Sequence, residues 1–513
     1  MVSTHREEII KIVSNLNDKK SSGLDDIDNR LLKNIIEHIV DPMVHIINLS
    51  ISNGIVPENM KVAKVIPVFK KGDKNDVSNY RPISLLTSMS KILERIIYTR
   101  TYKFLHLNNV FTDFQFGFRE KHCTSHALLT FLEKATQSLD KFCHMIGIFL
   151  DFSKAFDTIN HEILINKLYH YGIRGKALDW FRSYLSNRQQ LVSFNGYNSQ
   201  MRKIECGVPQ GSLLGPLLFI IYMNDFHRSS NTLSFILFAD DSNLFLSHPD
   251  PHILLNTVNE ELKLVTQWIH ANKLSLNLAK TKYMIFSNSI ENLPGDIIFD
   301  GTPLENVSCT TFLGVEVDNK LTWKYHINSI CKKISRNIGV INRLKQYFPS
   351  STLLMLYSSL ILPYLNYGIL VWGNTHQSLL DKILLLQKKS LRIIFNLNMR
   401  AHTDDLFCSN KLLKVKDLYL FQLGQFMFNY KNNNLPKVFD KIFYRNERLH
   451  NYPTRHSNEY HLPLLRTLLA QNTFVFTGPR FWNNLNDVHK NALSLPSFKR
   501  NLKLFLLESY TTQ

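Results

Sequence analysis

Two adjacent aspartates, Asp240 and Asp241, stand between two apolar runs, SFILFA before them and NLFL after them. Apolar runs on either side of a short polar step predict a β-hairpin within residues 233–246, with both acids at its tip. Carboxylates in that position either form the turn or bind a cation. Because a buried pair of like charges is costly unless it is neutralised, a divalent ion is a natural partner for them.

A third acid, Asp151, directly follows another apolar run, HMIGIFL at residues 144–150. Such a run is typical of a buried strand. If that strand lies beside the hairpin, three carboxylates come together, and oxygen donors of this kind suit Mg²⁺. Two such ions about 3.5–4 Å apart can hold the attacking and leaving oxygens of a phosphoryl transfer. The pattern therefore favours a metal site over three unrelated turn acids.

The elements that would position these acids are strands and helices in the middle of the chain and helices alone after it. Periodicity predicts helices at 9–49, broken at the turn-like KKSSGLDD, and at 88–105, 211–223 and 253–273, and strands at 62–69, 282–287 and 311–318. From residue 324 the chain reads as helical, with breaks at Pro349, Pro363 and Asn374. This order predicts an α+β core followed by a helical C-terminal part.

Composition and charge point to a polyanionic partner. The 513 residues are 44% hydrophobic and 20% charged, which excludes a disordered or fibrous chain. Lys and Arg number 60 against 42 Asp and Glu, a net charge of +18, and nucleic acid is the commonest partner of so basic a protein. Residues 320–400 hold twelve basic side chains and a single acid, Asp381, which favours a localised binding face over a solvated coat.

Cysteine spacing and hydropathy exclude several classes of protein. The six cysteines show no C-x-x-C and no zinc-site spacing with histidine, so we expect reduced thiols in an intracellular protein. The N-terminal MVSTHREEIIKIVSNLNDKK lacks the apolar core of a signal peptide. The longest apolar stretches, 213–223 and 358–372, are too short or too interrupted to span a bilayer. We therefore expect no membrane insertion.

Three motifs in chain order carry a resemblance: FLDFSKAFD at 149–157, GVPQGS at 207–212 and FADD at 238–241. They resemble the palm motifs of reverse transcriptases from non-LTR (LINE-like, jockey-type) retrotransposons. NYRPISL at 79–85 and QFGFR at 115–119 are similar to the fingers of that family, and FLGV at 312–315 with Trp323 and His326 to the segment after its palm. The resemblance covers about residues 21–400, and Phe481-Trp482 and Phe498-Lys499 extend it weakly into the tail. One departure is His122-Cys123-Thr124, where the family often has Ser-Thr.

The resemblance implies a right-hand polymerase fold with fingers, an antiparallel palm sheet and a helical thumb, followed by a mostly helical C-terminal region. The implied divisions are an N-terminal helical extension at 1–60, fingers at 61–143, a palm at 144–318 with an insertion at about 158–205, and a basic thumb at 319–400. Residues 401–513 form a C-terminal region whose role the sequence does not reveal.

Carried over residue by residue, the resemblance makes Asp151, Asp240 and Asp241 the catalytic metal ligands, for two Mg²⁺ ions with Mn²⁺ as a substitute. Phe156 becomes the side chain that blocks a ribose 2′-hydroxyl, on a turn of helix after Asp151. From composition alone, Phe156 would read as an ordinary core residue.

The remaining nucleotide contacts fall on Lys70, Arg81, Gln210 and Gly211. Arg81 and Lys70 resemble the fingers residues that grip the triphosphate, since Arg offers a planar fork to phosphate and Lys a point charge. The amide of Gln210 would bond the nucleotide or the template, and Gly211 would let the backbone approach the substrate. Solvated basic residues and a helix-capping loop are the structural alternatives.

Two further roles follow with less support from the residues themselves. Lys280 would protonate the leaving pyrophosphate, with Lys282 as a competitor and a plain surface lysine as the alternative. In the basic thumb, Lys332, Lys333, Arg336 and Arg343 would track the phosphates of the primer–template duplex. Trp323, Tyr325, Tyr347 and Trp372 interleave with them, and most of these four rings we assign to the core.

The predicted function is RNA-directed DNA polymerisation, with an RNA template, a DNA primer and dNTPs as partners. Because no nuclease precedes the fingers in this sequence, we expect a separate endonuclease to supply the primer end, and the nucleus as the place of function. One alternative is an inactive or domesticated RNA-binding relative, but decay usually removes one of the three acids, and all three are present. A maturase-like splicing protein is a second alternative, disfavoured by FLGVEVD, LTW and His326 after the palm.

Overall fold

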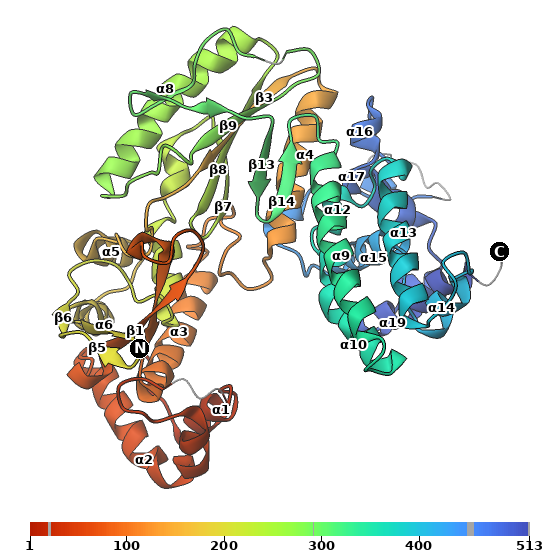
Figure 1. Ribbon diagram of the computed structural model, residues 1–513. Helices are drawn as coiled ribbons and strands as arrows, with labels where there is room; N and C mark the ends of the chain where they lie inside the picture. The colour runs from red at the N-terminus through yellow and green to blue at the C-terminus, as the bar shows by residue number, and fades with distance from the viewer. Residues whose placement is uncertain (19–21, 291, 449–455, 511–513) are drawn as a thin grey trace. The chain divides into compact units, whose positions relative to one another are not determined.

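The computed structural model describes residues 1–18, 22–290, 292–448 and 456–510 (Figure 1). The chain divides into two compact units, each made of three segments. The first unit comprises Met1–Phe118, Asp151–Asn231 and Glu261–Asn277. The second comprises Arg119–Leu150, Thr232–Glu260 and Leu278–Gln513.

A five-stranded sheet in the order β12-β9-β3-β8-β7 forms the centre of the second unit (Figure 1). Its strands are β3 (His144–Leu150), β7 (Ser234–Phe238), β8 (Asp241–His248), β9 (Lys282–Phe286) and β12 (Glu305–Asn306). All pairings are antiparallel except that of β12 with β9. Every residue of β3 is buried, as expected for the middle strand of a covered sheet. The strand predicted at 144–150 is therefore confirmed residue for residue.

Helix α4 (Thr124–Asp140) packs on this sheet through an apolar face. Phe131 is fully buried and meets Phe245, Phe286 and Phe312 with ring centroids 5.4–5.5 Å apart. Tilted and edge-to-face aromatic contacts of this kind add stability beyond the buried area, about 0.5–1.5 kcal/mol each. These contacts fix the sheet that carries the hairpin acids.

Helices fill the rest of the second unit. They are α9 (Lys324–Leu344), α10 (Ser350–Leu360), α11 (Leu362–Asn366), α12 (Ile369–Trp372), α13 (Gln377–Ile394), α14 (Asp404–Ser409), α15 (Val415–Lys431), α16 (Leu468–Gln471), α17 (Phe474–Asn483), α18 (Asp487–Lys490) and α19 (Leu495–Glu508). Helix α9 packs on α13 and on β14 (Val315–Asp318), and α15 packs on α13, α17 and α19. The helical C-terminal part expected from the sequence is thus confirmed.

The C-terminal helices are joined to α4 by a specific contact. The carboxylate of Asp140 accepts hydrogen bonds from the backbone N–H groups of Arg466 and Thr467 and from the Thr467 hydroxyl. The guanidinium of Arg466 lies 3.5 Å from the centroid of the Phe142 ring. Trp482 and Phe498, two of the tail positions that carry the family resemblance, are both buried, with their rings 6.0 Å apart. The tail is therefore an integral part of this unit's core.

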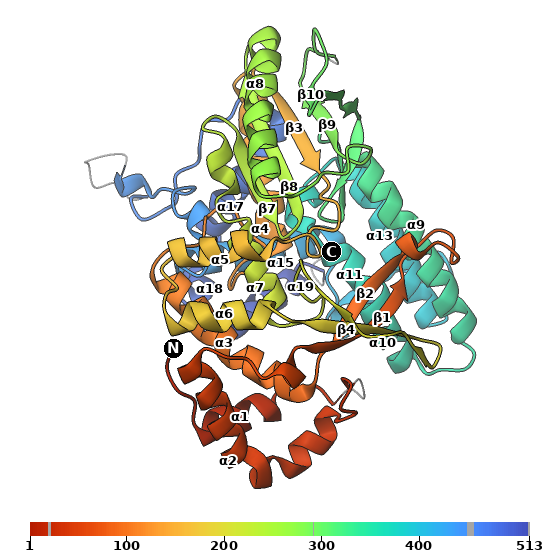
Figure 2. The same ribbon diagram turned by 90° about the vertical axis from the view of Figure 1, so that its left-hand side faces the viewer.

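The first unit is built on a second sheet. Its strands are β1 (Val62–Phe69), β2 (Tyr80–Leu85), β4 (Gln189–Phe194), β5 (Tyr197–Asn198) and β6 (Arg202–Lys203). The helices are α1 (Arg6–Ser14), α2 (Asn29–Asn53), α3 (Ser88–Leu107), α5 (His161–His170), α6 (Lys176–Leu185) and α7 (Leu214–Tyr222). Figure 2 shows α5, α6 and α7 close to one another, and α7 also contacts α3. Helix α8 (Pro251–Ala271) begins in the second unit and ends in the first.

Several sequence predictions differ from the structure at turns. The single strand predicted at 311–318 is a hairpin of β13 (Cys309–Phe312) and β14, because Leu313 and Gly314 both take positive φ and reverse the chain. The helix predicted from Gly211 begins at Leu214, after a turn. Residues 153–157 form turns, so Phe156 is not on a helix. Part of the predicted KKSSGLDD turn, residues 19–21, lies outside the described residues.

The prediction for the four aromatic side chains of the basic segment holds for two of them. Trp323 and Trp372 are buried as expected, but Tyr325 and Tyr347 are exposed, at 53% and 73% of their surface. Two strand pairs, β10 (Ile298–Phe299) with β11 (Thr302–Pro303) and β13 with β14, form two-stranded sheets of their own. Among the described helices, none combines the length and the hydropathy needed to cross a bilayer.

Candidate active site

The predicted hairpin with two acids is present in the second unit. Strands β7 and β8 pair antiparallel up to Phe238 and Asp241, so Ala239 and Asp240 form a two-residue turn. Ala239 has φ +57°, a left-handed conformation that costs a residue with a Cβ about 1–2 kcal/mol. Asp240 and Asp241 are both exposed. Strain retained in a turn with two solvent-facing carboxylates is typical of functional sites.

Asp151 directly follows β3, the strand that lies beside β8 in the sheet. The last residue of β3, Leu150, pairs with Ser242, which directly follows Asp241. Asp151 is the next residue after Leu150 and the first residue of a segment of the first unit. Its carbonyl accepts a hydrogen bond of 2.8 Å from the backbone N–H of Asn277, and the Ser153 N–H donates to Ser275. The backbone at Asp151 is thus held by residues 275–277.

The donor chemistry of these residues fits a divalent cation. Exposed carboxylates supply the hard oxygen ligands that Mg²⁺ prefers. Within the described part of the chain, no three His, Cys, Asp or Glu side chains are gathered closely enough to hold a metal ion. The second unit contributes Asp240 and Asp241, and Asp151 belongs to the first.

The predicted triphosphate contacts lie on the β1–β2 hairpin of the first unit. Val68 pairs with Arg81 and Phe69 with Tyr80, and beyond them the Lys70 N–H donates to the Asn79 carbonyl at 2.9 Å. Lys70 and Arg81 are therefore at the same end of this hairpin, and both side chains are exposed. Two exposed cationic side chains at one end of a hairpin can bind the negatively charged triphosphate of a nucleotide.

Gln210 and Gly211 pack against the same hairpin. The Gln210 carbonyl accepts a 2.7 Å hydrogen bond from the backbone N–H of Ser84 on β2. Gly211 has φ +119°, and a Cβ at this position would lie 2.6 Å from the Ser84 carbonyl oxygen. The glycine is required by its contact with β2, which is a different reason from the approach to substrate that the sequence suggested.

Phe156 is half-buried between two other rings. Its ring stacks on Phe219 of α7 with centroids 4.4 Å apart and meets Phe118 edge-on at 6.3 Å. The Phe156 carbonyl accepts a 2.9 Å hydrogen bond from the backbone N–H of Val208. The turn that carries Phe156 is therefore bonded to the segment that carries Gln210.

Sequence reasoning missed Asp157, which is directly bonded to a predicted site residue. Its carboxylate oxygens accept hydrogen bonds from Nε2 of Gln210 at 2.9 and 3.0 Å. Burial raises the pKa of Asp157, and the bond from Gln210 opposes that shift. The only sequence feature that pointed to Asp157 is its place in FLDFSKAFD.

Glu94, on α3, is a second residue that sequence reasoning missed. It is buried, and it accepts hydrogen bonds from the Tyr184 hydroxyl at 2.6 Å and from the Leu213 backbone N–H at 2.7 Å. Burial raises the pKa of this carboxyl. Arg188, whose surface is fully buried, lies over the Tyr184 ring at 4.7 Å, and its Nε and Nη2 have no hydrogen-bond partner among the described residues. A buried acid and a buried base thus lie beneath the start of α7.

The two candidate general acids occupy different positions. Lys280 is exposed in the turn that precedes β9. Lys282, on β9, is paired with Glu305 of β12, with Nζ 2.9 Å from Oε2.

The predicted primer–template residues all lie exposed on α9, whose opposite face is buried through Ile327, Ile330, Ile334, Ile338 and Ile341. Lys332 and Arg336, one helical turn apart, line a shallow hollow together with Asn328, Cys331 and Ser335. Arg343 is exposed further along the same helix. The ammonium of Lys333 instead lies 5.8 Å from the centre of the Tyr364 ring.

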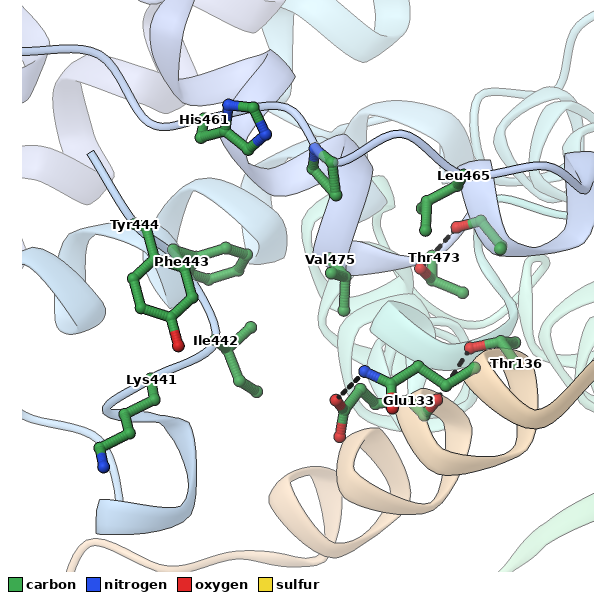
Figure 3. A pocket seen from close by; sticks show the side chains of 13 residues that line it. Glu133, Thr136, Lys441, Ile442, Phe443, Tyr444, His461, Leu465, Thr473 and Val475 are labelled. Atoms are coloured by element: carbon green, nitrogen blue, oxygen red, sulfur yellow. Dashed lines mark hydrogen bonds between the residues drawn. The ribbon is translucent and has the colours of Figure 1, made fainter. Parts of the chain in front are cut away.

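A pocket of about 330 Å³ in the second unit contains none of the predicted site residues (Figure 3). It lies between α4, which contributes Glu133 and Thr136, and the C-terminal region, which contributes Tyr444, His461 and Thr473. Burial raises the pKa of Glu133, whose carboxylate accepts a 2.9 Å hydrogen bond from Gln137. The lining of this pocket, which is part polar and part apolar, does not identify a ligand.

Comparison with known proteins identifies the class to which this fold and these motifs belong. The family model for "Reverse transcriptase (RNA-dependent DNA polymerase)" matches residues 69–317. That range runs from the end of β1 to β14 and includes all three acids, Phe156 and Gln210. The chain belongs to the reverse transcriptase family, whose members copy a nucleic acid template from a primer with dNTPs and use divalent metal ions.

Within this family the chain is of the jockey type found in non-LTR retrotransposons. It is 30% identical over 422 residues to the "RNA-directed DNA polymerase from mobile element jockey" of Drosophila funebris, an alignment that covers 80% of this chain and 46% of the relative. The jockey protein of Drosophila melanogaster is 29% identical with the same coverage. The "Probable RNA-directed DNA polymerase from transposon BS" of that species is 28% identical, over 76% of this chain and 44% of the relative. The chain thus spans somewhat less than half the length of these relatives.

Proposed function

We propose that this protein is an RNA-directed DNA polymerase of a non-LTR retrotransposon, which extends a primer 3′-hydroxyl with dNTPs on an RNA template. The observation that carries the proposal is the pair of exposed acids in the strained β7–β8 turn, in register with the end of β3. The jockey-type relatives support it, because their names state this activity.

In the proposed reaction, the oxygen of the primer 3′-hydroxyl attacks the α-phosphorus of the dNTP, and the hydroxyl proton passes to solvent water. The bond from the α-phosphorus to the bridging oxygen breaks, and pyrophosphate leaves. Bound Mg²⁺, or Mn²⁺ in its place, would neutralise charge and polarise the reacting phosphate. Asp151, Asp240 and Asp241 would hold the ions, and Lys280 would donate a proton to the leaving pyrophosphate.

The first unit would bind the incoming nucleotide. Lys70 and Arg81, exposed at one end of the β1–β2 hairpin, would hold the triphosphate. Gln210, bonded to the same hairpin through Ser84, would contact the nucleotide. Phe156 would close the space of a ribose 2′-hydroxyl, since its ring is fixed by stacking on Phe219.

The domain assignments belong to the same proposal. We assign the fingers to 61–143, the palm to 144–318 with its insertion at 158–205, the thumb to 319–400, and an N-terminal extension to 1–60. The thumb would bind the primer–template duplex through Lys332, Lys333, Arg336 and Arg343 of α9. We further propose that an endonuclease supplies the primer end and that the protein works in the nucleus. Residues 401–513 would support the thumb, because α15 packs on α13.

Primer extension on an RNA template with dNTPs and Mg²⁺ tests the proposal. The native protein should synthesise DNA, and Asp240→Ala should abolish synthesis while the protein remains folded. Asp487→Ala, which removes an exposed carboxylate from α18, is the matched control and should keep full activity. A folded native protein that binds RNA without synthesis would overturn the polymerase assignment in favour of an inactive RNA-binding relative. DNA synthesis that survives Asp240→Ala would overturn the assignment of Asp240 to the metal site.

A further inference from the structure

Asp157 and Gln210 form a contact that none of the proposed roles uses. Both carboxylate oxygens of Asp157 lie within hydrogen-bond distance of the Gln210 Nε2 atom, at 2.9 and 3.0 Å. The two residues are 53 positions apart in the chain, and both are half-buried. A partly desolvated hydrogen bond to a charged group is among the stronger ones in proteins, contributing about 1.5–3 kcal/mol.

The chemistry of the pair fixes the orientation of the glutamine amide. An ionised carboxylate can only accept hydrogen bonds, so it must face the NH₂ end of the amide. The Oε1 atom of Gln210 is then turned away from Asp157. This oxygen is the part of the amide that the contact with Asp157 does not use. Asp157→Ala would leave the Gln210 amide free to rotate and to reverse its donor and acceptor ends.

The backbone around the pair is bonded at several further points. The Gly207 N–H donates to the Ile159 carbonyl at 2.8 Å, and the Val208 N–H donates to the Phe156 carbonyl at 2.9 Å. A Cβ at Gly207 would lie 2.6 Å from the Asp157 carbonyl oxygen, so the two segments are in direct backbone contact. The backbone therefore keeps these segments together without the Asp157 side chain, whose specific contribution is to the amide of Gln210.

We propose that Asp157 is a positioning residue for nucleotide binding, which holds the Gln210 side chain in one rotamer with its carbonyl oxygen presented to the substrate. This inference rests on the proposed function, because it assigns Gln210 to the nucleotide site of a polymerase. Asp157 acts through Gln210 and makes no contact with the nucleotide itself. Asp157 also links two of the predicted nucleotide contacts, because it is bonded to Gln210 and directly follows Phe156 in the chain.

A double-mutant cycle on the Michaelis constant for dNTP tests the inference. Asp157→Ala should raise KM about tenfold, the equivalent of losing one such hydrogen bond, and should change kcat much less. In a Gln210→Ala background, Asp157→Ala should have no further effect on KM, because the side chain it positions is gone. Equal effects of Asp157→Ala in both backgrounds would overturn the inference.

Two more variants separate positioning from general damage to the fold. Asp157→Asn keeps one acceptor oxygen for the Gln210 amide and should restore KM to within about threefold of the native value. Glu162→Ala removes an exposed carboxylate five residues away and should leave KM unchanged. A KM for Asp157→Asn as high as that of Asp157→Ala would contradict the inference.

A measurement without catalysis keeps the two proposals apart. If the native protein makes no DNA, the proposed function fails. The interaction of Asp157 with Gln210 is then tested by thermal unfolding of the native protein, the two single alanine variants and the double variant. Asp157→Ala and Gln210→Ala should each lower the melting temperature, and the double variant should melt no lower than the less stable single variant. Additive decreases would show that the two side chains do not interact, and the inference would fail by itself.

Discussion

The carboxylate of Glu94 on α3 accepts a hydrogen bond from the backbone N–H of Leu213 at 2.7 Å, although the two residues are 119 positions apart. Leu213 directly precedes α7, where the Ser212 hydroxyl accepts a hydrogen bond from the Gly215 N–H at 2.9 Å but does not reach the Leu213 N–H. Free N–H groups at a helix start are normally satisfied by a nearby Ser, Thr, Asp or Asn. Here the Leu213 N–H is satisfied by a carboxylate from a different helix, and this bond connects the end of the GVPQGS segment to the core of the first unit.

Replacing Glu94 should therefore destabilise the protein strongly. Glu94→Ala removes the acceptor of the Leu213 N–H and of the Tyr184 hydroxyl, and each buried donor left without a partner should cost about 1–3 kcal/mol. Glu94→Gln keeps one acceptor oxygen and should lose less. Chemical denaturation measures both, with Glu162→Gln as the control for an exposed glutamate. A Glu94→Ala protein as stable as the native one would contradict this account.

Gly211 should tolerate alanine much less well than a glycine of similar φ in open space. Both Gly211→Ala and Gly196→Ala place a Cβ at positive φ, which costs about 1 kcal/mol. Only at Gly211 does that Cβ also meet a backbone atom, the Ser84 oxygen at 2.6 Å, whereas nothing lies within 4 Å at Gly196. We expect Gly211→Ala to lower kcat/KM for dNTP at least tenfold, and Gly196→Ala to leave it near the native value. Similar losses in steady-state kinetics would refute the contact argument.

Phe156 should control the choice between deoxyribonucleotides and ribonucleotides. Phe156→Val shortens the side chain, so incorporation of rNTP relative to dNTP should rise about tenfold or more. Phe152→Leu is the matched control, because Phe152 is a buried ring in the same segment that packs on Phe226. It should lower stability and keep the ratio. Measuring kcat/KM for rNTP and for dNTP tests this role of Phe156. An unchanged ratio of the two values in Phe156→Val would assign the Phe156 ring to packing alone.

Lys332 and Arg336 should contribute to primer–template binding in a salt-dependent way. Each phosphate contact adds about −0.9 to the slope of the logarithm of the binding constant against the logarithm of salt concentration. Replacing both residues with alanine should therefore make the slope shallower by about 2 if each meets one phosphate. The pair Lys499→Ala and Arg500→Ala on α19 removes the same charge and should leave the slope unchanged. Equal changes for both pairs would point to general charge attraction and not to a face on α9.

His326 should make the protein less stable in mild acid. It lies on the buried face of α9, its Nδ1 accepts a hydrogen bond from the Glu316 N–H, and burial lowers its pKa to about 4. Below the unfolded pKa of about 6.5, the unfolded chain binds a proton that the folded protein does not. The stabilising contribution is therefore complete above about pH 6.5 and is lost as the pH falls towards 4, by about 3 kcal/mol.

Denaturation at several pH values checks this assignment. Burial also lowers the pKa of His126 to about 4. The loss of stability of the native protein in acid should therefore contain a contribution from each of the two histidines. His326→Gln should remove part of the acid-induced loss of stability, and His126→Gln another part. An acid dependence that neither substitution reduces would exclude both histidines as its cause.

The sequence by itself determined the elements that depend on local pattern. The apolar runs at 62–69 and 144–150 became β1 and β3 with the predicted bounds, and FADD became the tip of a hairpin, with Asp240 in its turn and Asp241 at the start of β8. The motifs and their order also sufficed to identify the family, because the chemistry of nucleotidyl transfer constrains residue types within short segments. Turns were predicted less well, since Leu313 and Phe156 have side chains that do not reveal a positive φ or a non-helical turn.

Only the tertiary structure determined which residues work in pairs. Gln210 is bonded to Asp157 across 53 residues, and the start of α7 is capped by Glu94 across 119. No local pattern encodes these partners, because hydrogen bonds between segments depend on how helices and strands pack and not on spacing along the chain. The same holds for Gly211, whose need for glycine comes from a carbonyl on β2. The sequence specified the chemistry of the residues, and packing decided which of them hold the others in place.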